Sequence, residues 1–218
     1  MKRKLLICLF LISSIVVNSQ VFRPYIGVGA YLHTDFQKSV FMSFKTGGEF
    51  KVNRYFKPEL EISGLIGSLE TRSKVNDNNI MIEEYTRAVS AINFSFCPKI
   101  VLGNAKELDS YFVVLPRFSI SNIEANKRSY LYNNTTGTLT SDKKETVKNW
   151  SQSFGIGIGY NFDLSVENSD SMCLILDLQN VDLGKAINEL STNASRVDTK
   201  WTLGLGLNYY FNLKRKKS

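Results

Sequence analysis

The sequence has few residues of the kinds that support metal, redox or acid–base chemistry. Among 218 residues there are three cysteines and one histidine, and the cysteines lack the paired spacing of a zinc or redox motif. Four prolines are present, and no stretch has the composition of a linker or a disordered region. We therefore expect one folded unit with no catalytic, cofactor-binding or metal-binding residues, and no cofactor.

Excess charge and long apolar runs are also missing from most of the chain. The formal net charge of +7 comes from 27 basic and 20 acidic residues. Three basic residues lie at 2–4 and four at 214–217, which leaves 20 basic residues against 20 acidic ones. The composition thus gives no reason to expect a nucleic-acid partner. Beyond residue 19, no segment reaches the roughly 20 apolar residues of a transmembrane helix.

The N-terminus has the layout of a secretory signal peptide. Lys2, Arg3 and Lys4 form a basic start, and an apolar or small-residue run follows at 5–17. Small residues precede Gln20, as cleavage requires. The expected division is a signal peptide at 1–19 and one domain at 20–218. An exported chain without a spanning helix can enter a membrane only as a closed β-barrel.

The pattern that says most about the fold is alternation with a period of two. In 150–162 nearly every second residue is large and apolar, with Gln152 as the exception, and the intervening residues are small or polar. Successive side chains of a β-strand point to opposite faces. A strand between lipid and a narrow lumen has this appearance. The same alternation runs from Trp201 to Phe211.

Similar alternation predicts eight strands in all. The fold class expected is all-β: a single eight-stranded antiparallel up-and-down transmembrane β-barrel after a cleavable signal peptide. The expected strands are Tyr25–Leu32, Val40–Val52, Phe56–Ile66, Ala88–Leu102, Phe112–Ile120, Trp150–Phe162, Met172–Leu178 and Trp201–Phe211.

The connections between these strands differ in length in a regular way. After the first one, short connections alternate with long ones at 69–86, 122–148 and 185–198. Outer-membrane barrels have short periplasmic turns and longer extracellular loops. Both termini would then lie on the periplasmic side.

A soluble lipocalin-like barrel that binds a small apolar ligand is the structural alternative, because it also alternates. Its outer face would be rich in Lys and Glu. The polar faces of 151–159 and 202–206 offer mainly Ser, Thr and Gly, which suits a crowded lumen of eight strands. The composition favours the membrane barrel.

With these features the chain resembles the small eight-stranded outer-membrane β-barrel proteins, in the style of the OmpA transmembrane domain, OmpX and the PorT-like family. The resemblance covers 20–211 and rests on the export signal, strand spacing, loop asymmetry and aromatic last strand. It implies that the barrel assembly machinery reads this strand, where Tyr209 and Phe211 match. The chain departs from the pattern in its extension 212–218.

The barrel prediction assigns the charged residues of the strands to the lumen. There they would form a structural ion-pair network or, alternatively, a gated ion path. A general porin is not expected, because an open aqueous channel needs about 16 strands. The residues expected mostly on the lumen face are Lys45, Glu49, Lys51, Glu59, Glu61, Lys99, Arg117, Asp163, Asp177 and Lys200.

Enzymatic activity is not expected, but one alternative is specific. Small barrels that modify lipids carry their His and Ser groups at the extracellular rim, where His33 is expected. Asp35 and Ser39 are near it in the sequence, and a Ser nucleophile needs such a base and acid. The simpler interpretation is a solvent-exposed rim histidine. We expect no disulfide between Cys97 and Cys173, which fall on strands that are not neighbours.

The expected location is therefore the outer membrane of a bacterium, with outer-membrane lipids as neighbours. The expected role is structural or interaction-based, through extracellular loops or as an accessory of envelope or secretion machinery. The longest loop, 122–148, carries Tyr and Asn residues that suit adaptable contacts with a protein or surface ligand. The basic run at 214–217 is expected to be solvated or to lie near anionic headgroups.

Overall fold

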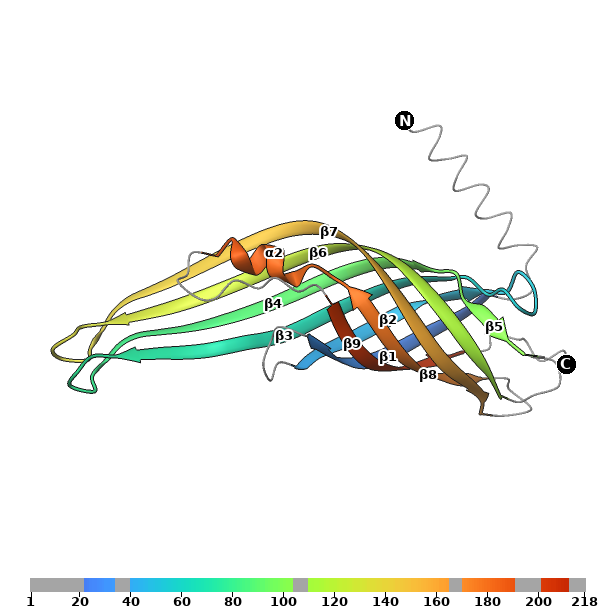
Figure 1. The fold of residues 1–218 in the computed structure, drawn as a ribbon, viewed down its shortest axis with the longest axis horizontal. Coiled ribbons are helices and arrows are strands. Elements are labelled where there is room, and N and C mark those ends of the chain that lie inside the picture. The colour runs from blue at the N-terminus through green and yellow to red at the C-terminus, as the bar shows by residue number, and fades with distance from the viewer. Residues whose placement is uncertain (1–21, 34–39, 104–109, 165–169, 191–200, 212–218) are drawn as a thin grey trace, which may run out of the picture.

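The computed structural model describes residues 22–33, 40–103, 110–164, 170–190 and 201–211. They form an antiparallel sheet with one short helix (Figure 1). The elements are β1 (Phe22–His33), β2 (Val40–Phe50), β3 (Glu59–Val75), β4 (Met81–Cys97), β5 (Ile100–Leu102), β6 (Ser110–Tyr132), β7 (Leu139–Asp163), β8 (Ser171–Asn180), α2 (Leu183–Asn188) and β9 (Trp201–Tyr210).

The strand pairing closes on itself. Each strand from β1 to β4 pairs with the next, β4 pairs with β6, the series continues from β6 to β9, and β9 pairs with β1. Eight long strands thus form the ring. β5 follows β4 after a break at Pro98 and Lys99 and pairs with β6. The expected antiparallel all-β fold is confirmed.

The ladder is staggered, as a closed barrel requires. From Pro24, successive pairs lead across β2, β3, β4 and β6 to Phe154 on β7. Phe154 has no described partner on β8, so the path continues from Ile156, which lies two residues closer to the level of Pro24 along the barrel. From Ile156, pairs lead across β8 and β9 to Leu32 on β1. The path returns to β1 eight residues after Pro24, and the two residues stepped back on β7 make the full stagger about ten residues. Such a stagger tilts the strands by about 35–45° from the barrel axis.

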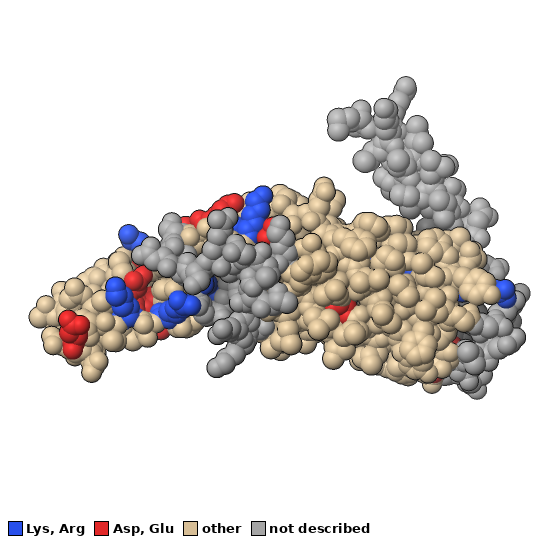
Figure 2. All heavy atoms as spheres, in the orientation of Figure 1, with Lys and Arg blue, Asp and Glu red and all other residues tan. Residues whose placement is uncertain are grey.

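The outward side chains of the barrel are apolar, and the inward ones are polar or small. Ile26, Ile158 and Leu205 are 54%, 55% and 58% exposed, whereas the inward Lys99 and Arg117 are 0% and 2% exposed. On the face seen in Figure 2 most charged side chains gather where β3, β4, β6 and β7 project beyond the other strands. A wall that faces lipid has this polarity, which contradicts the soluble, lipocalin-like alternative.

The prediction of long loops at 69–86 and 122–148 is wrong, because most of these residues belong to strands. β3 and β4 continue to a turn at 76–80, and β6 and β7 to a turn at 133–138. The four strands run on beyond the barrel as a sheet, which we call the extension (residues 68–88 and 124–148; Figure 1). Both faces of this sheet carry polar residues, so its strands lack the alternation of apolar and polar residues by which the other strands were predicted.

Three smaller expectations also differ from the structure. The strand expected at 56–66 begins at Glu59, and Phe56 forms only an isolated bridge with Ile100. The strand expected at 88–102 is interrupted at Pro98, which has no N–H to give to a ladder. The connection expected at 185–198 contains part of α2, a helix too short to be recognised by its periodicity. No helix among the described residues is long and apolar enough to cross a membrane.

Two glycines on neighbouring strands provide a matched test of the interior packing. A Cβ at Gly47, on the lumen side of β2, would clash with the carbonyl oxygen of Leu60 and lie 2.8 Å from the ring of Tyr25, whereas a Cβ at Gly64, on the outward side of β3, would meet nothing within 4 Å. We expect Gly47→Ala to lower the free energy of unfolding by about 1–3 kcal/mol through overpacking, and Gly64→Ala to leave it unchanged. Urea unfolding of both variants in vesicles checks this difference, and equal effects would contradict the described packing.

Candidate functional site

The first charged cluster in the lumen surrounds Lys99, which lies between β4 and β5. Its Nζ donates to Glu49 Oε2 on β2 at 2.7 Å and to Glu59 Oε1 on β3 at 2.8 Å. Arg23 on β1 contacts Glu49 at 3.4 Å. Lys57, 7% exposed and bonded to Tyr111, is a third cation that interacts electrostatically with Glu49, so three basic side chains surround the two carboxylates. The Lys99 Nζ also lies 4.1 Å from the centre of the Tyr210 ring.

The second charged cluster is neutral. Arg117 on β6 donates to Glu61 on β3 and lies 3.4 Å from Asp177 on β8. Lys45 on β2 lies 3.5 Å from the same oxygen of Asp177. All four side chains are at most 4% exposed. Buried charges are costly unless they are paired, so the balance of two positive and two negative groups explains how they are tolerated.

Three buried tyrosines donate further hydrogen bonds to these carboxylates. Tyr25 donates its hydroxyl to Glu61 at 3.1 Å, Tyr31 to Asp177 at 2.9 Å and Tyr210 to Glu59 at 2.8 Å. The rings of Tyr25 and Tyr210 are 5.0 Å apart. The clusters and tyrosines link β1, β2, β3, β6, β8 and β9 across the lumen, which they fill with bonded side chains.

Most of the predicted lumen charges are confirmed, and two are wrong. Lys51 and Asp163 are exposed beyond the end of β2 and at the last position of β7. Lys200 lies outside the described residues. Sequence reasoning missed Arg23 and the tyrosine donors, although Tyr25 and Tyr31 alternate with outward apolar residues in β1. The confirmed residues are Lys45, Glu49, Glu59, Glu61, Lys99, Arg117 and Asp177.

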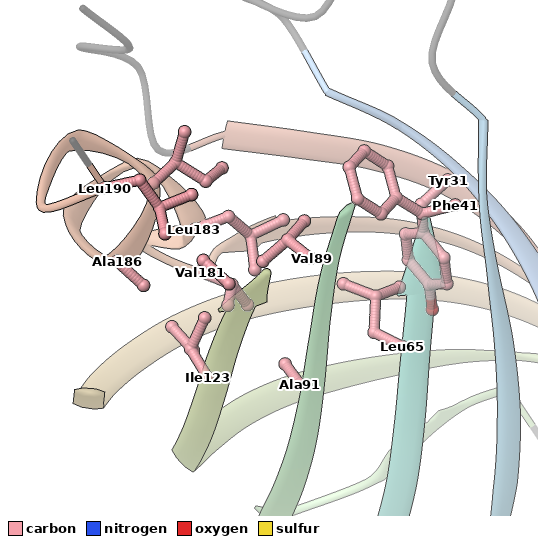
Figure 3. Packing of buried hydrophobic residues seen from close by; sticks show 12 residues of the cluster. Tyr31, Phe41, Leu65, Val89, Ala91, Ile123, Val181, Leu183, Ala186 and Leu190 are labelled. Atoms are coloured by element: carbon pink, nitrogen blue, oxygen red, sulfur yellow. The ribbon is translucent and has the colours of Figure 1, made fainter. Parts of the chain in front are cut away.

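The end of the barrel nearest the extension is closed by α2 and apolar side chains. Val181, Leu183, Ala186, Ile187 and Leu190 are at most 3% exposed. They pack against inward residues of the barrel and extension, as Figure 3 shows. Asp182 begins the helix by accepting a hydrogen bond from the backbone N–H of Lys185. Those inward residues are Tyr31, Phe41, Leu65, Val89, Ala91, Ile123 and Ala125.

His33 belongs to this closed end of the barrel. It is 4% exposed, and its ring centre lies 6.4 Å from that of Phe41. The expected solvent-exposed rim position is therefore wrong. Asp35 and Ser39, which were considered as its partners, lie outside the described residues. Cys97 and Cys173 are buried free thiols, and no group of three potential metal ligands occurs in the described part of the chain.

The extension carries ion pairs on the face that continues the outer wall of the barrel. Arg128 Nη2 lies 2.7 Å from Asp142 Oδ2, and Lys148 Nζ lies 2.9 Å from Glu124 Oε2. The hydrogen bonds donated by Arg128 lower the pKa of Asp142. In the described ranges, β3 beyond Ile66 pairs only with β4, and β7 before Gly155 pairs only with β6. Two strand edges of the extension thus have no neighbouring strand among the described residues.

Comparisons with known proteins identify the fold. No protein-family model and no curated protein sequence matches the chain. Neisserial surface protein A superposes with a TM-score of 0.50 and 9% identity, over 88% of this chain and 97% of that protein.

Two further solved structures superpose less closely. The attachment invasion locus protein Ail of Yersinia pestis gives a TM-score of 0.43 with 11% identity, over 87% and 97% of the two chains. A major outer membrane protein of Thermus thermophilus gives 0.49 with 11% identity, over 88% and 100%. Of these three likenesses, that to Neisserial surface protein A carries the conclusion that this chain shares the fold of a small bacterial surface barrel.

Proposed function

We propose that this chain is an integral protein of a bacterial outer membrane and that it acts through contacts of its extension. The observation that carries the proposal is the reversed polarity of the barrel, with an apolar outer wall around paired, buried charges. Within the described residues the ladder closes on itself, so most backbone groups of the wall are hydrogen-bonded without water, apart from the edge of β7 before Gly155. The fold shared with Neisserial surface protein A supports the same location.

The filled lumen argues against transport as the main role. The two charged clusters occupy its middle and the end away from the extension, and α2 with its apolar contacts occupies the other end. Eight strands leave little room beyond these side chains. The proposed role is therefore interaction rather than passage of solutes, with a partner protein or surface ligand at the extension. We infer a role without catalysis, because His33, the candidate catalytic residue, is 4% exposed and lies beside the Phe41 ring rather than open to a substrate.

The last strand fits the proposed route of insertion. Tyr209 lies on the outward side of β9 and Phe211 directly follows its last residue, and their ring centres are 4.8 Å apart. The resemblance to small outer-membrane barrels implies that the barrel assembly machinery reads these aromatic residues. Changing Phe211 to Ser is the direct test, with the amount of assembled protein as the measurement.

Fractionation tests the location. The protein is expected in the outer-membrane fraction, and an alkaline wash should leave it there because the apolar wall is buried in lipid. Release into the soluble fraction by the wash would overturn the proposal. A periplasmic protein with a signal peptide serves as the control for a protein that is released.

An inserted epitope tests the orientation and the accessibility of the extension. A tag placed after Thr135, in the turn between β6 and β7, should bind antibody on intact cells. A tag placed after Arg54, in the turn between β2 and β3, should bind only after the membrane is opened, because that turn lies at the opposite end of the barrel. The reverse result would place the extension in the periplasm.

A further inference from the structure

The outer wall of the barrel has a groove of about 700 Å³ that the proposed function leaves unassigned. It crosses β2, β3, β4, β6 and β7 on the side that faces away from the lumen. Two rows of outward side chains form its flanks, and each row is set by strand register. One flank comprises Leu60, Phe96 and Phe118, and the other comprises Ile62, Phe94 and Ile120.

The dimensions of this groove suit a single hydrocarbon chain. Outward residues two apart on a strand are separated by about 6.8 Å, and five neighbouring strands span about 19 Å. The two flanks therefore bound a narrow channel somewhat longer than one leaflet of a hydrocarbon core about 30 Å thick. Its volume also lies within the range of about 300–1,000 Å³ found for small-molecule sites.

The two ends of the groove lie at different depths in the apolar wall. Gln152, at one end, is two residues from Trp150, and Lys148 follows on the same face, so this end lies at the border with the extension. Thr46, at the other end, lies in mid-strand on β2 beyond the exposed Met42 and Phe44. Strand tilt makes a row across the sheet climb along the barrel axis, which produces this difference in depth.

The polar groups at the two ends also differ. Thr46 donates its hydroxyl to the carbonyl oxygen of Tyr25 at 3.3 Å. No group in the described ranges hydrogen-bonds to the side-chain amide of Gln152, although this residue points out of an otherwise apolar wall. An amide that loses water without gaining a partner costs free energy. A ligand that lies in the groove and offers a polar group at Gln152 removes that cost.

We propose that the groove binds one acyl chain of a membrane lipid from the leaflet on the side of the extension. The ester, amide or hydroxyl group near the head of the lipid hydrogen-bonds to Gln152, and the chain descends between the two flanks toward Thr46. The inference rests on the proposed membrane location and deepens it, because it assigns one lipid to a defined place among those that surround the barrel.

Lipid retention tests this site. The full chain is reconstituted in vesicles of phosphatidylethanolamine and phosphatidylglycerol, extracted with a mild detergent and measured by native mass spectrometry. We expect the protein to retain one phospholipid. Ile62→Trp should abolish retention by placing an indole in the groove. Leu205→Trp, which introduces the same side chain on the outward face of β9, should preserve retention. Gln152→Leu keeps the apolar flank but loses one hydrogen bond, so retention should fall about 2- to 10-fold.

The readouts separate failure of this site from failure of the proposed function. Each variant is first checked for a mobility shift on boiling, which shows that the barrel has folded. An integral, folded protein that retains no phospholipid would overturn the site and leave the membrane location intact. Equal retention by Ile62→Trp and Leu205→Trp would also overturn it. A protein that does not enter the vesicles would overturn both proposals.

Discussion

Lys99→Met should destabilise the barrel by about 3–5 kcal/mol, because removal of one partner leaves buried charge uncompensated. Lys99 is fully buried and donates to both Glu49 and Glu59. Without it, Lys57 and Arg23 are the described cations that still interact with Glu49, and neither is bonded to Glu59 in the structure. Urea unfolding in vesicles, followed by the loss of the folded band on an unheated gel, measures the change.

A second substitution separates the charge from the packing of the Lys99 side chain. Adding Glu59→Gln to Lys99→Met removes one unpaired carboxylate and should restore part of the lost free energy. Lys143→Met, in the exposed part of β7 in the extension, is the control and should change stability by less than about 0.5 kcal/mol. If Lys99→Met were as mild as Lys143→Met, the cluster would not bear on stability as described.

Ile158→Arg should have the second-largest effect, because it places a charge in the middle of the lipid-facing wall. Ile158 is 55% exposed on β7, between the outward residues Ile156 and Tyr160. An arginine at the bilayer midplane costs a transmembrane barrel about 2–4 kcal/mol, and one near the interface about 0–1 kcal/mol. The measurement is again unfolding in vesicles.

Val40→Arg is the matched control for this depth dependence. Val40 is 52% exposed, close to the value for Ile158, but it is the first residue of β2, at the end of the wall near the extension. We expect a small cost there. Equal costs at the two positions would show that they do not differ in membrane depth.

Alternation predicted the barrel well wherever the two faces of a strand differ in chemistry. In β7 the outward residues from Phe154 to Tyr160 are apolar and exposed, while Gly155, Gly157 and Gly159 face the lumen and are buried. The physical cause is that lipid selects one face and a crowded interior the other. The same contrast placed Lys45, Glu61 and Arg117 in the lumen.

The extension was not predictable by the same criterion, because both of its faces carry polar residues. Arg128 and Tyr130 on one face and Ser129 on the other are all compatible with a loop, and nothing in the period of two distinguishes them. The pairing of this segment with β7 is a long-range property: Arg128 lies opposite Lys144, and Ser129 opposite Lys143. Composition indicated a surface segment, and 126–148 is at least partly exposed, but Ile123 and Ala125 are buried and the backbone is strand rather than loop.

The candidate site shows a similar division between what is local and what is not. Apart from Arg23 and Lys57, the charged residues of the two clusters were identified from their own strands, but their grouping depends on which strands meet across the lumen. Tyr210 on β9 donates to Glu59 on β3, which is not its neighbour in the sheet. The apolar closure by α2 was missed because six residues show too little periodicity to indicate a helix, and the partners of these residues are distant in sequence.

Electrophoresis of boiled and unboiled protein tests the central claim of a closed, integral barrel most directly. The sample is the protein that remains in the outer-membrane fraction after an alkaline wash, dissolved in detergent without heating. A closed ladder of eight strands should survive this treatment, so the unboiled protein should migrate differently from the boiled one. Identical mobility of the two samples, or absence of the protein from the washed membrane, would contradict the account.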